Sequence, residues 1–446
     1  MRALKAVGKT KTLFAAPLGA EEFAALIVRF FPRNTSPIAI AVSGGPDSMA
    51  LALCMARWLG RRKSNAHAFV VDHGLRVNAT AEAEQTKKAL VTLGIKAEIL
   101  RWDHPPIVSK LHEVARKARY RLLIEACQKR GINALLLAHQ REDQAETILM
   151  RLAKGSGVDG LAGMKTETCI EDVRILRPLL DMPKERLIAT CRAADVPYVS
   201  DPSNAAEKFA RGRLRRVMPL LAEEGLTIER LLDLGARARG AKDALDHASS
   251  MLVRVATKRD DAGTIRLDLE YLRTAPREIG RRALATCLQA VHAEDYPPAY
   301  DALSRLLEAL RVDRPMPTCT LHGCLVVQGK RHAAIMREYA GITEMPALRP
   351  GKSAVWDKRW RITLAETAPR GLTLRPLGNP PHALLDKLAP GLRKQIPEGR
   401  ARASLPALWH GEKLALIPTL PNSSRAKRTW ADFAAGWPPP FLPISN

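Results

Sequence analysis

Long apolar runs, closely spaced cysteine pairs and aromatic residues are all scarce in this 446-residue sequence. No uninterrupted apolar stretch reaches the ~18 residues of a membrane-spanning helix, so we expect a soluble protein with no membrane contact. The seven cysteines are scattered and include no CxxC pair, which favours neither a zinc nor an iron–sulfur site and indicates a reducing, cytoplasmic compartment. Aromatic residues form only 5% of the chain, which argues against a sandwich of many aromatic-rich strands.

Acidic residues are too few to balance the basic ones. The chain has 70 Lys and Arg against 46 Asp and Glu, which leaves a formal net charge of +24. Its hydrophobic content of 46% is that of a globular protein, and its length suggests roughly two to four domains. The excess of positive charge predicts a polyanionic partner, and nucleic acid is the first candidate.

Short apolar runs alternate with longer helix-like segments from residue 38 to about 200. The runs cover 38–44, 67–74, 97–102 and 133–140, and each leads into a polar turn. This alternation predicts an α/β fold, a doubly wound parallel sheet of Rossmann-like type. Ligands of such sheets bind beyond the carboxyl ends of the strands, so the residues that follow each run are the first candidates for a site.

Composition and hydrophobic periodicity change along the chain, and these changes predict four parts. Arg-, Leu- and Ala-rich segments with helical periodicity follow the α/β region, and a stretch rich in strand-forming residues follows at 319–338. Pro and Gly clusters mark further boundaries. The expected parts are an N-terminal extension (1–36), the α/β domain (37–225), a mostly helical RNA-binding domain (226–345) and a small α+β C-terminal domain with a Pro-rich tail (346–446).

A glycine-rich turn lies between the first apolar run and an amphipathic helix. Its glycines permit a tight bend in which the amide N–H groups point into the turn, and the helix N-terminus adds positive potential. Phosphate is therefore the predicted ligand. No GK[ST] follows, which argues against ordinary γ-phosphoryl transfer. The turn, SGGPDS, consists of Ser43, Gly44, Gly45, Pro46, Asp47 and Ser48.

Asp47 is unusual in such a loop. A carboxylate beside bound phosphate is repelled unless a cation such as Mg²⁺ bridges the two, so the loop predicts a metal. The alternative is that Asp47 only complements the dipole of the helix that it begins, while the glycines shape an ordinary turn.

A second candidate segment, HQREDQAET, follows the fourth apolar run. His139, Asp143 and Glu146 are four and three residues apart, so they share one face of a helix. The ordinary interpretation is that the acids complement the helix dipole and the histidine packs locally. Because the segment leaves the carboxyl end of a strand, Asp143 and Glu146 could instead hold Mg²⁺ or an incoming ammonium group.

Three further segments offer weaker candidates. Asp72 and His73 end the second run and are expected to line a nucleoside pocket, with a simple Asx turn as the alternative. Arg119 belongs to a series of charges three residues apart, which is usually a solvated, ion-paired helix face. A later cluster predicts a basic patch for RNA phosphates, or else another solvated helix. It consists of Arg211, Arg213, Arg215 and Arg216, preceded by Asp201 and Asn204.

These motifs resemble the PP-loop ATP pyrophosphatase superfamily, whose SGGxDS loop grips pyrophosphate as the leaving group while a substrate oxygen attacks the α-phosphate. Within it, the chain is similar to the tRNA(Ile)-lysidine synthetase family, strongly in its first half and thinly in its last hundred residues. The segments that carry the likeness are SGGPDS, VDHGLR at 71–76, ARKARY at 115–120, LAHQREDQAET at 137–147, RPLL at 177–180, SDPSN at 200–204 and FARGRLRRVMPLL, and more weakly HGC at 322–324, VWDKRW and LTLRPLG.

The resemblance implies an ATP-dependent ligase that joins L-lysine to C2 of the wobble cytidine of an isoleucine tRNA with a CAU anticodon. An adenylated cytidine is the intermediate, and the products are lysidine, AMP and pyrophosphate. A homodimer is a further possibility. At Gly212 the chain departs from the family, in which an asparagine usually follows the arginine, so only backbone contacts to the tRNA are expected there.

The same resemblance implies roles for individual residues. Asp143 is expected to accept a proton from the lysine amine, and Arg119 to stabilise phosphate charge. The implied sets are: catalysis by Asp47, Arg119, Asp143 and Glu146; ATP binding by Ser43, Gly44, Gly45, Pro46, Asp47, Ser48, Asp72 and His73; Mg²⁺ binding by Asp47 and Asp143; tRNA binding by Asp201, Asn204, Arg211 and Arg215.

Two alternatives remain open at this stage. A PP-loop tRNA thiolase would normally show a catalytic cysteine pair or cluster ligands, and the missing CxxC counts against it. A noncatalytic RNA-binding protein with a decayed nucleotide site is opposed by the intact loop at 43–48 and by the acids Asp143 and Glu146. Release of pyrophosphate in the presence of tRNA separates this second alternative from the ligase.

Overall fold

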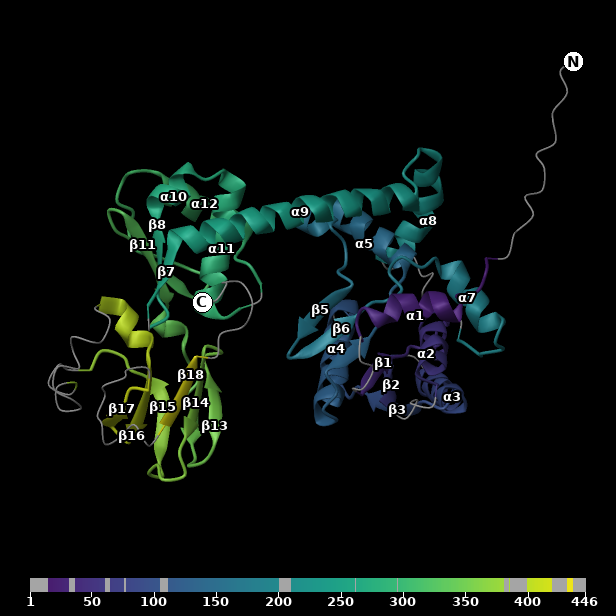
Figure 1. The fold of residues 1–446 in the computed structure, drawn as a ribbon, viewed down its shortest axis with the longest axis horizontal. Helices are drawn as coiled ribbons and strands as arrows, with labels where there is room; N and C mark the ends of the chain where they lie inside the picture. The colour runs from purple at the N-terminus through teal and green to yellow at the C-terminus, as the bar shows by residue number, and fades with distance from the viewer. Residues whose placement is uncertain are drawn as a thin grey trace, which may run out of the picture. The chain divides into compact units, whose positions relative to one another are not determined.

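The computed structural model divides into two compact units, Met1–Lys242 and Asp243–Asn446, which are considered separately (Figure 1). The boundary falls within one helix, α9 (Ile228–Ala256). No helix in the described part of the chain is both long and apolar enough to cross a membrane. The structure describes residues 15–31, 37–60, 65–75, 78–104, 111–199, 210–260, 262–294, 296–380, 385, 399–418 and 431–435.

A six-stranded sheet in the order β3-β2-β1-β4-β6-β5 forms the centre of the first unit. All neighbouring strands run parallel except β5, which is antiparallel to β6 at the edge. The predicted α/β class and the four predicted strand positions are confirmed. The strands are β1 (Ile38–Ala41), β2 (Ala66–Asp72), β3 (Lys96–Arg101), β4 (Ala134–Leu136), β5 (Glu167–Ile170) and β6 (Val173–Leu176).

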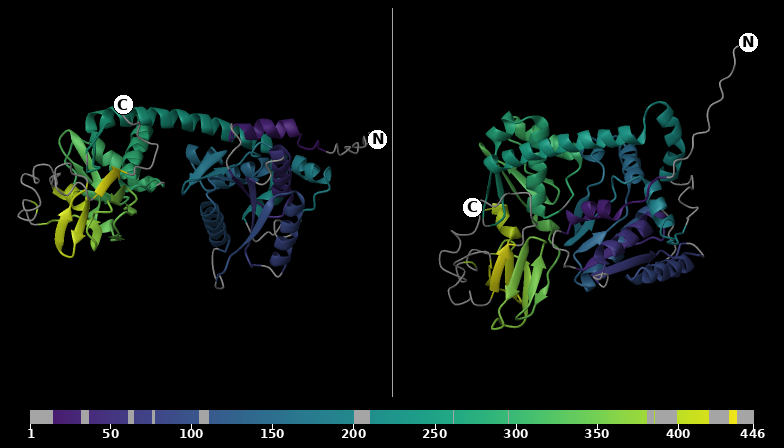
Figure 2. Two further views of the ribbon diagram at one scale, coloured as in Figure 1. Left: turned by 60° about the horizontal axis from the view of Figure 1, so that its bottom comes forward. Right: turned by 45° about the vertical axis from the view of Figure 1, so that its right-hand side comes forward.

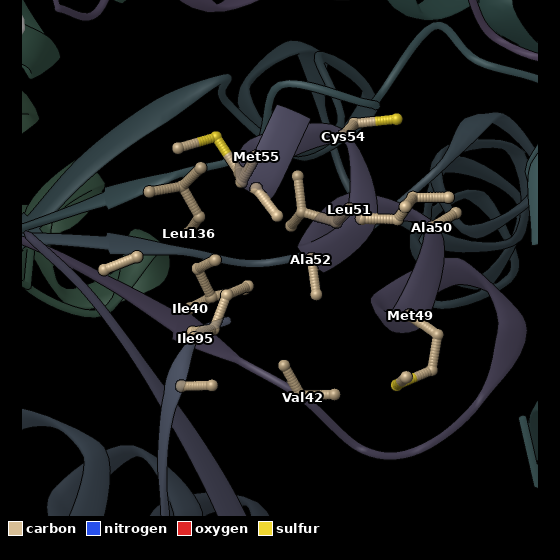
Figure 3. Packing of buried hydrophobic residues seen from close by; sticks show 14 of the residues in the cluster. Ile40, Val42, Met49, Ala50, Leu51, Ala52, Cys54, Met55, Ile95 and Leu136 are labelled. Atoms are coloured by element: carbon tan, nitrogen blue, oxygen red, sulfur yellow. The ribbon is translucent and has the colours of Figure 1, made fainter. Parts of the chain in front are cut away.

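Helices cover both faces of this sheet (Figure 2). Successive side chains of a strand point to opposite faces, so Ile38 and Ile40 join one core and Ala39 the other. The first core holds α1 (Ala20–Val28), α2 (Pro46–Leu59), α3 (Ala79–Thr92) and α7 (Lys184–Arg192), and the second holds α4 (Leu111–Lys129). Figure 3 shows Met49, Leu51 and Met55 of α2 packed in the first core.

A smaller core lies beyond the end of β4. There α5 (Arg141–Ala153) and α6 (Val158–Leu161) pack with α8 (Ala210–Glu223) and the first turns of α9. Their contact is close, because a Cβ added at Gly235 of α9 would come within 2.5 Å of the Ile148 side chain of α5. The helix α5, which carries the predicted acids, is therefore packed against α6, α8 and the start of α9.

The second unit contains a five-stranded antiparallel sheet in the order β7-β8-β11-β10-β9, which packs against the end of α9 and three further helices. Its strands β9 to β11 coincide with the strand-forming stretch predicted at 319–338. The strands are β7 (Thr257–Arg259), β8 (Ile265–Asp268), β9 (Cys319–Leu321), β10 (Cys324–Gln328) and β11 (His332–Arg337), and the helices are α10 (Leu269–Thr274), α11 (Arg277–His292) and α12 (Tyr300–Arg311).

Two small antiparallel sheets complete the second unit, with orders β12-β15-β16-β17 and β13-β14-β18. Trp356 and Trp360 are the largest side chains of their core. The elements are β12 (Ala347–Leu348), β13 (Ser353–Trp356), β14 (Trp360–Leu364), β15 (Leu372–Pro376), β16 (Pro406–His410), β17 (Lys413–Leu416) and β18 (Ala431–Ala435), with the short 3-10 helices η3 (Tyr339–Gly341) and η5 (Gly399–Ser404).

Candidate functional site

The glycine-rich turn between β1 and α2 is folded back on itself by its two serines. The amide of Ser43 donates to the Ser48 hydroxyl oxygen at 3.2 Å, the two hydroxyl oxygens are also 3.2 Å apart, and the Ser48 hydroxyl donates to the Gly45 carbonyl at 3.0 Å. Gly45 is the extended N-cap of α2 and Pro46 its first residue. The first amides of α2 lack carbonyl partners within the helix, as a phosphate-binding helix start requires.

Gly44 is the one position in this turn where a side chain cannot fit. Its φ is +84°, and a Cβ there would come within 2.5 Å of the Thr86 hydroxyl oxygen of α3. Its carbonyl accepts a hydrogen bond of 2.8 Å from the amide of Val199. The turn is thus fixed between α3 and the segment that follows α7.

Asp47, in the first turn of α2, is only partly exposed and lacks a full set of partners. Among the described residues, its Oδ1 is the one buried carboxylate oxygen without a hydrogen-bond donor. Burial raises its pKa from an ordinary 3.8 to about 6. The positive charge of Lys184 opposes this rise, and the negative charge of Asp143 adds to it. Asp47 therefore needs either a proton or a cation at this position.

The predicted acids of α5 are fixed by a capping box at the start of that helix. The Gln140 side chain accepts hydrogen bonds from the amides of Glu142 and Asp143, and Asp143 Oδ2 in turn accepts from the Gln140 amide at 3.2 Å. His139 directly precedes this cap and is half-buried at the end of β4. The negative charge of Asp143 raises the pKa of Asp47, so the phosphate-loop acid and the α5 acids form one electrostatic cluster.

Arg215 of α8 lies against these acids. Its guanidinium donates through Nε to Oε1 of Glu146 and through Nη2 to Oε2 at 3.2 Å, and Nη2 lies 3.9 Å from Asp143 Oδ1. Glu146 is buried, with 4% of its surface exposed, so this two-pronged pair neutralises a carboxylate that water hardly reaches. The negative charges of Glu146, Asp143 and Asp47 keep the pKa of Arg215 above its ordinary value despite burial.

Comparison with known proteins now decides the family. Residues 20–221 match the model of the PP-loop domain. The chain is 42% identical over 320 residues to the tRNA(Ile)-lysidine synthase of Methylobacterium nodulans, an alignment that covers 70% of this chain and 94% of that protein. The chain belongs to the tRNA(Ile)-lysidine synthase family.

More distant tRNA(Ile)-lysidine synthases align over still more of the chain. The one from Ruegeria pomeroyi is 33% identical, covering 88% of this chain and 91% of that protein, and the one from Anaplasma marginale is 31% identical, covering 85% of each. The family predicted from the motifs, and with it the class of ATP-dependent ligase, is confirmed. The thiolase and the decayed RNA-binding module are not favoured.

Asp72 has a structural function in this lysidine synthase family member. Its carboxylate accepts the Gly74 amide at 3.0 Å and the Thr80 hydroxyl at 2.7 Å, which is the Asx turn considered as the alternative. Its neighbour His73 is packed edge-to-face on Trp102, with ring centroids 6.0 Å apart. Asp72 thus holds the turn that presents His73 at the carboxyl end of β2.

Arg119 of α4 reaches the same end of the sheet as His73. Burial lowers the pKa of His73, and the positive charge of Arg119 lowers it further. The guanidinium carbon of Arg119 also lies 5.7 Å from the ring centroid of Tyr120. Arg119 thus lies close enough to His73 to affect it electrostatically, and its role toward phosphate stays a prediction.

The donor set around Asp47 fits Mg²⁺ shared with a nucleotide. The orphan Oδ1 of Asp47 offers a hard anionic ligand in need of a cation. In the described ranges, no group of three or more His, Cys, Asp or Glu side chains is arranged to hold a metal by itself. Mg²⁺ bound through one or two carboxylates, with phosphate oxygens and water as its other ligands, is compatible with both facts.

The predicted tRNA contacts are only partly described. Asp201 and Asn204 lie outside the described residues, and Arg211 is the second residue of α8. Arg213 and Arg216 of the same helix are exposed, whereas the Arg215 side chain lies on the α5 acids. Tight binding to RNA phosphates by Arg215 would require it to leave those acids.

Lys184, the first residue of α7, is a site residue that the sequence reasoning missed. Its amide donates to Glu142 Oε2 at 3.0 Å, and its positive charge lowers the pKa of Asp47. The only available signal was a lysine directly after Pro183, at the start of a helix that follows the edge of the parallel sheet. That signal is too common to single out a residue, because basic residues after proline are frequent on surfaces.

Proposed function

We propose that this chain uses ATP to join L-lysine to C2 of the wobble cytidine of an isoleucine tRNA with a CAU anticodon, forming lysidine, AMP and pyrophosphate. The observation that carries the proposal is the convergence of Asp47 with Asp143 and Glu146. One acid belongs to the phosphate-binding turn and two belong to the first two turns of α5. Asp47 lacks a partner, and Arg215 already marks a cation position at Glu146. The cytoplasmic location and the homodimer stay predictions.

The phosphate-binding turn holds the triphosphate in the first step. The amides at the start of α2 and the hydroxyls of Ser43 and Ser48 donate to the pyrophosphate portion, which departs when the cytidine O2 attacks the α-phosphate. Arg119 stabilises the charge on the phosphate during transfer. Asp47 and Asp143 hold Mg²⁺, which supplies neutralising charge beside the phosphates.

The second step uses the acids of α5. Adenylation turns the C2 oxygen into a good leaving group, so that the lysine ε-amine can attack C2 and displace AMP. Asp143 accepts the proton that the amine loses, a task for which its capped position beside the phosphate loop is suited. Glu146 binds the ammonium form of the amine, Asp143 takes the proton that makes it a nucleophile, and the second proton, released when the C–N bond forms, passes to solvent.

Mass spectrometry of nucleosides tests the proposal directly. Isoleucine tRNA is incubated with the protein, ATP, Mg²⁺ and isotopically labelled lysine, and we expect the label on the wobble cytidine. The Asp143→Asn variant should lose lysine transfer while it still binds ATP. Tight tRNA binding without pyrophosphate release or labelled product would refute the proposal, and unchanged product formation by the variant would remove Asp143 from the site.

A further inference from the structure

Arg215 occupies the position where the proposed function requires an ammonium group. Its guanidinium contacts both oxygens of Glu146, and Asp143 lies 3.9 Å from Nη2. These are the two acids assigned to the lysine amine. A carboxylate as buried as that of Glu146 is strongly destabilised without a partner, so some cation must remain there throughout the cycle.

The helix that carries Arg215 faces two environments. Leu214 and Met218 of α8 pack on the core of α5, while Arg213 and Arg216 are exposed. Arg215 lies between these faces, with 36% of its side chain exposed. Its long side chain can therefore exchange a carboxylate for a phosphate oxygen on the exposed side, because both anions match the guanidinium fork.

We propose that Arg215 is an internal substitute for the substrate lysine: it neutralises Glu146 and Asp143 in the free protein, and a phosphate group of a bound substrate draws it away and opens these acids to lysine. The inference rests on the proposed function, because it takes lysine as the group that the acids bind. Glu146 is buried and Arg215 already contacts both of its oxygens, so the guanidinium repels and sterically excludes a second cation, and lysine and Arg215 compete. Lysine then binds tightly only after a phosphate-bearing substrate, ATP or tRNA, is in place.

Calorimetric titration of L-lysine into the full chain tests this competition. Lysine is titrated into the protein alone, with Mg²⁺ and a nonhydrolysable ATP analogue, and with isoleucine tRNA. If lysine-competent molecules are about a tenth of the free population, the phosphate-bearing ligand should tighten lysine binding ~10-fold in the wild type. Whether the analogue or the tRNA does so identifies the source of the phosphate.

The Arg215→Met variant should bind lysine ~10-fold more tightly than the wild type when no other ligand is present, and neither ligand should add a further gain. Arg215→Lys, which cannot span both oxygens of Glu146, should be intermediate. Arg216→Met is the matched control, since it removes the same charge from the same helix and should leave lysine binding to the ligand-free protein unchanged. Structural damage at α8 would weaken lysine binding, so a gain distinguishes competition from damage.

The inference is overturned if Arg215→Met and Arg215→Lys, shown to be folded by circular dichroism, bind lysine no more tightly than the wild type does. That result leaves the proposed function intact as long as the wild type still transfers labelled lysine to tRNA. Absence of lysine transfer in every form would instead refute the proposed function. Lysine binding to Arg215→Met that survives the added change Glu146→Gln would place the amine elsewhere and also count against the competition.

Discussion

The Asp47→Asn substitution should make the protein more stable and inactive at the same time. Asp47 sits in a turn built for phosphate, and its Oδ1 is buried without a donor. In the absence of nucleotide and metal, the negative charge therefore lowers the stability of the fold. An asparagine of the same shape removes this charge and keeps the helix start intact, but it cannot hold the Mg²⁺ of the proposed function.

The expected gain follows from the raised pKa of Asp47. Each pH unit between the folded and the unfolded pKa is worth about 1.4 kcal/mol, so a rise from 3.8 to about 6 corresponds to about 3 kcal/mol as an upper limit. Partial solvent screening reduces this to about 1–3 kcal/mol. Because the folded pKa of this acid lies above the unfolded value, the loss of stability is absent below pH 3.8, grows as the pH rises, and is complete above about pH 6.

Urea unfolding in metal-free buffer measures the gain, and ATP-dependent pyrophosphate release measures the loss of activity. Near pH 5 the difference in the free energy of unfolding between Asp47→Asn and the wild type should be roughly half of the difference near pH 7.5. Asp159→Asn is the charge-matched control, because Asp159 is exposed on α6, and it should change stability by less than about 0.5 kcal/mol. A variant less stable than the wild type, or one that still releases pyrophosphate, would show that the carboxylate is satisfied within the fold and would refute the reasoning.

Three other outcomes are expected. Gly44→Ala should lose ATP-dependent activity because its Cβ meets α3. Gly131→Ala is the control: Gly131 also has a positive φ, at the end of α4, but a Cβ there meets nothing within 4 Å, so this change should cost only about 1–2 kcal/mol of stability and retain activity in the same assays. Asp357→Asn should destabilise the second unit by about 3–5 kcal/mol in thermal unfolding, because two buried arginines, Arg337 and Arg359, lose their partner. Glu294→Gln removes a carboxylate from a half-exposed ion pair with Lys358 and should cost less than about 1 kcal/mol. The affinity for tRNA should fall by on the order of 100-fold or more between 50 and 200 mM salt in filter binding, and a flat response would contradict phosphate recognition by the basic surface.

The positions of the strands and of the two main site segments could be predicted from the sequence. Buried parallel strands are apolar on both faces, so their runs stand out, and the turns that follow them must meet at one edge of the sheet. The topology then brings Asp47 close to Asp143, although 96 positions separate them. Local rules also gave the Asx turn at Asp72 as an alternative, and its hydrogen bonds are present.

Contacts set by tertiary packing could not be predicted. The sequence places Arg215 in a run of arginines that fits an RNA-binding face, and no local pattern shows that one of them turns to Glu146, 69 residues away. Lys184 is equally inconspicuous, and the short strands β7 and β8 lie in a region whose periodicity is mainly helical. In each case the deciding interaction joins segments that are distant in sequence, and neither helix nor strand periodicity encodes it.

The buried acids of the candidate site have partners of different kinds. Asp72 accepts hydrogen bonds from Gly74 and Thr80, Asp143 takes part in the cap of α5, and Glu146 is paired with Arg215. Among the described residues, Asp47 alone keeps a buried carboxylate oxygen without a donor, and it belongs to the turn that meets phosphate. The fold thus satisfies these acids with its own groups except at Asp47, where we propose that phosphate and its cation bind, and the raised pKa of Asp47 is the energetic consequence of that exception.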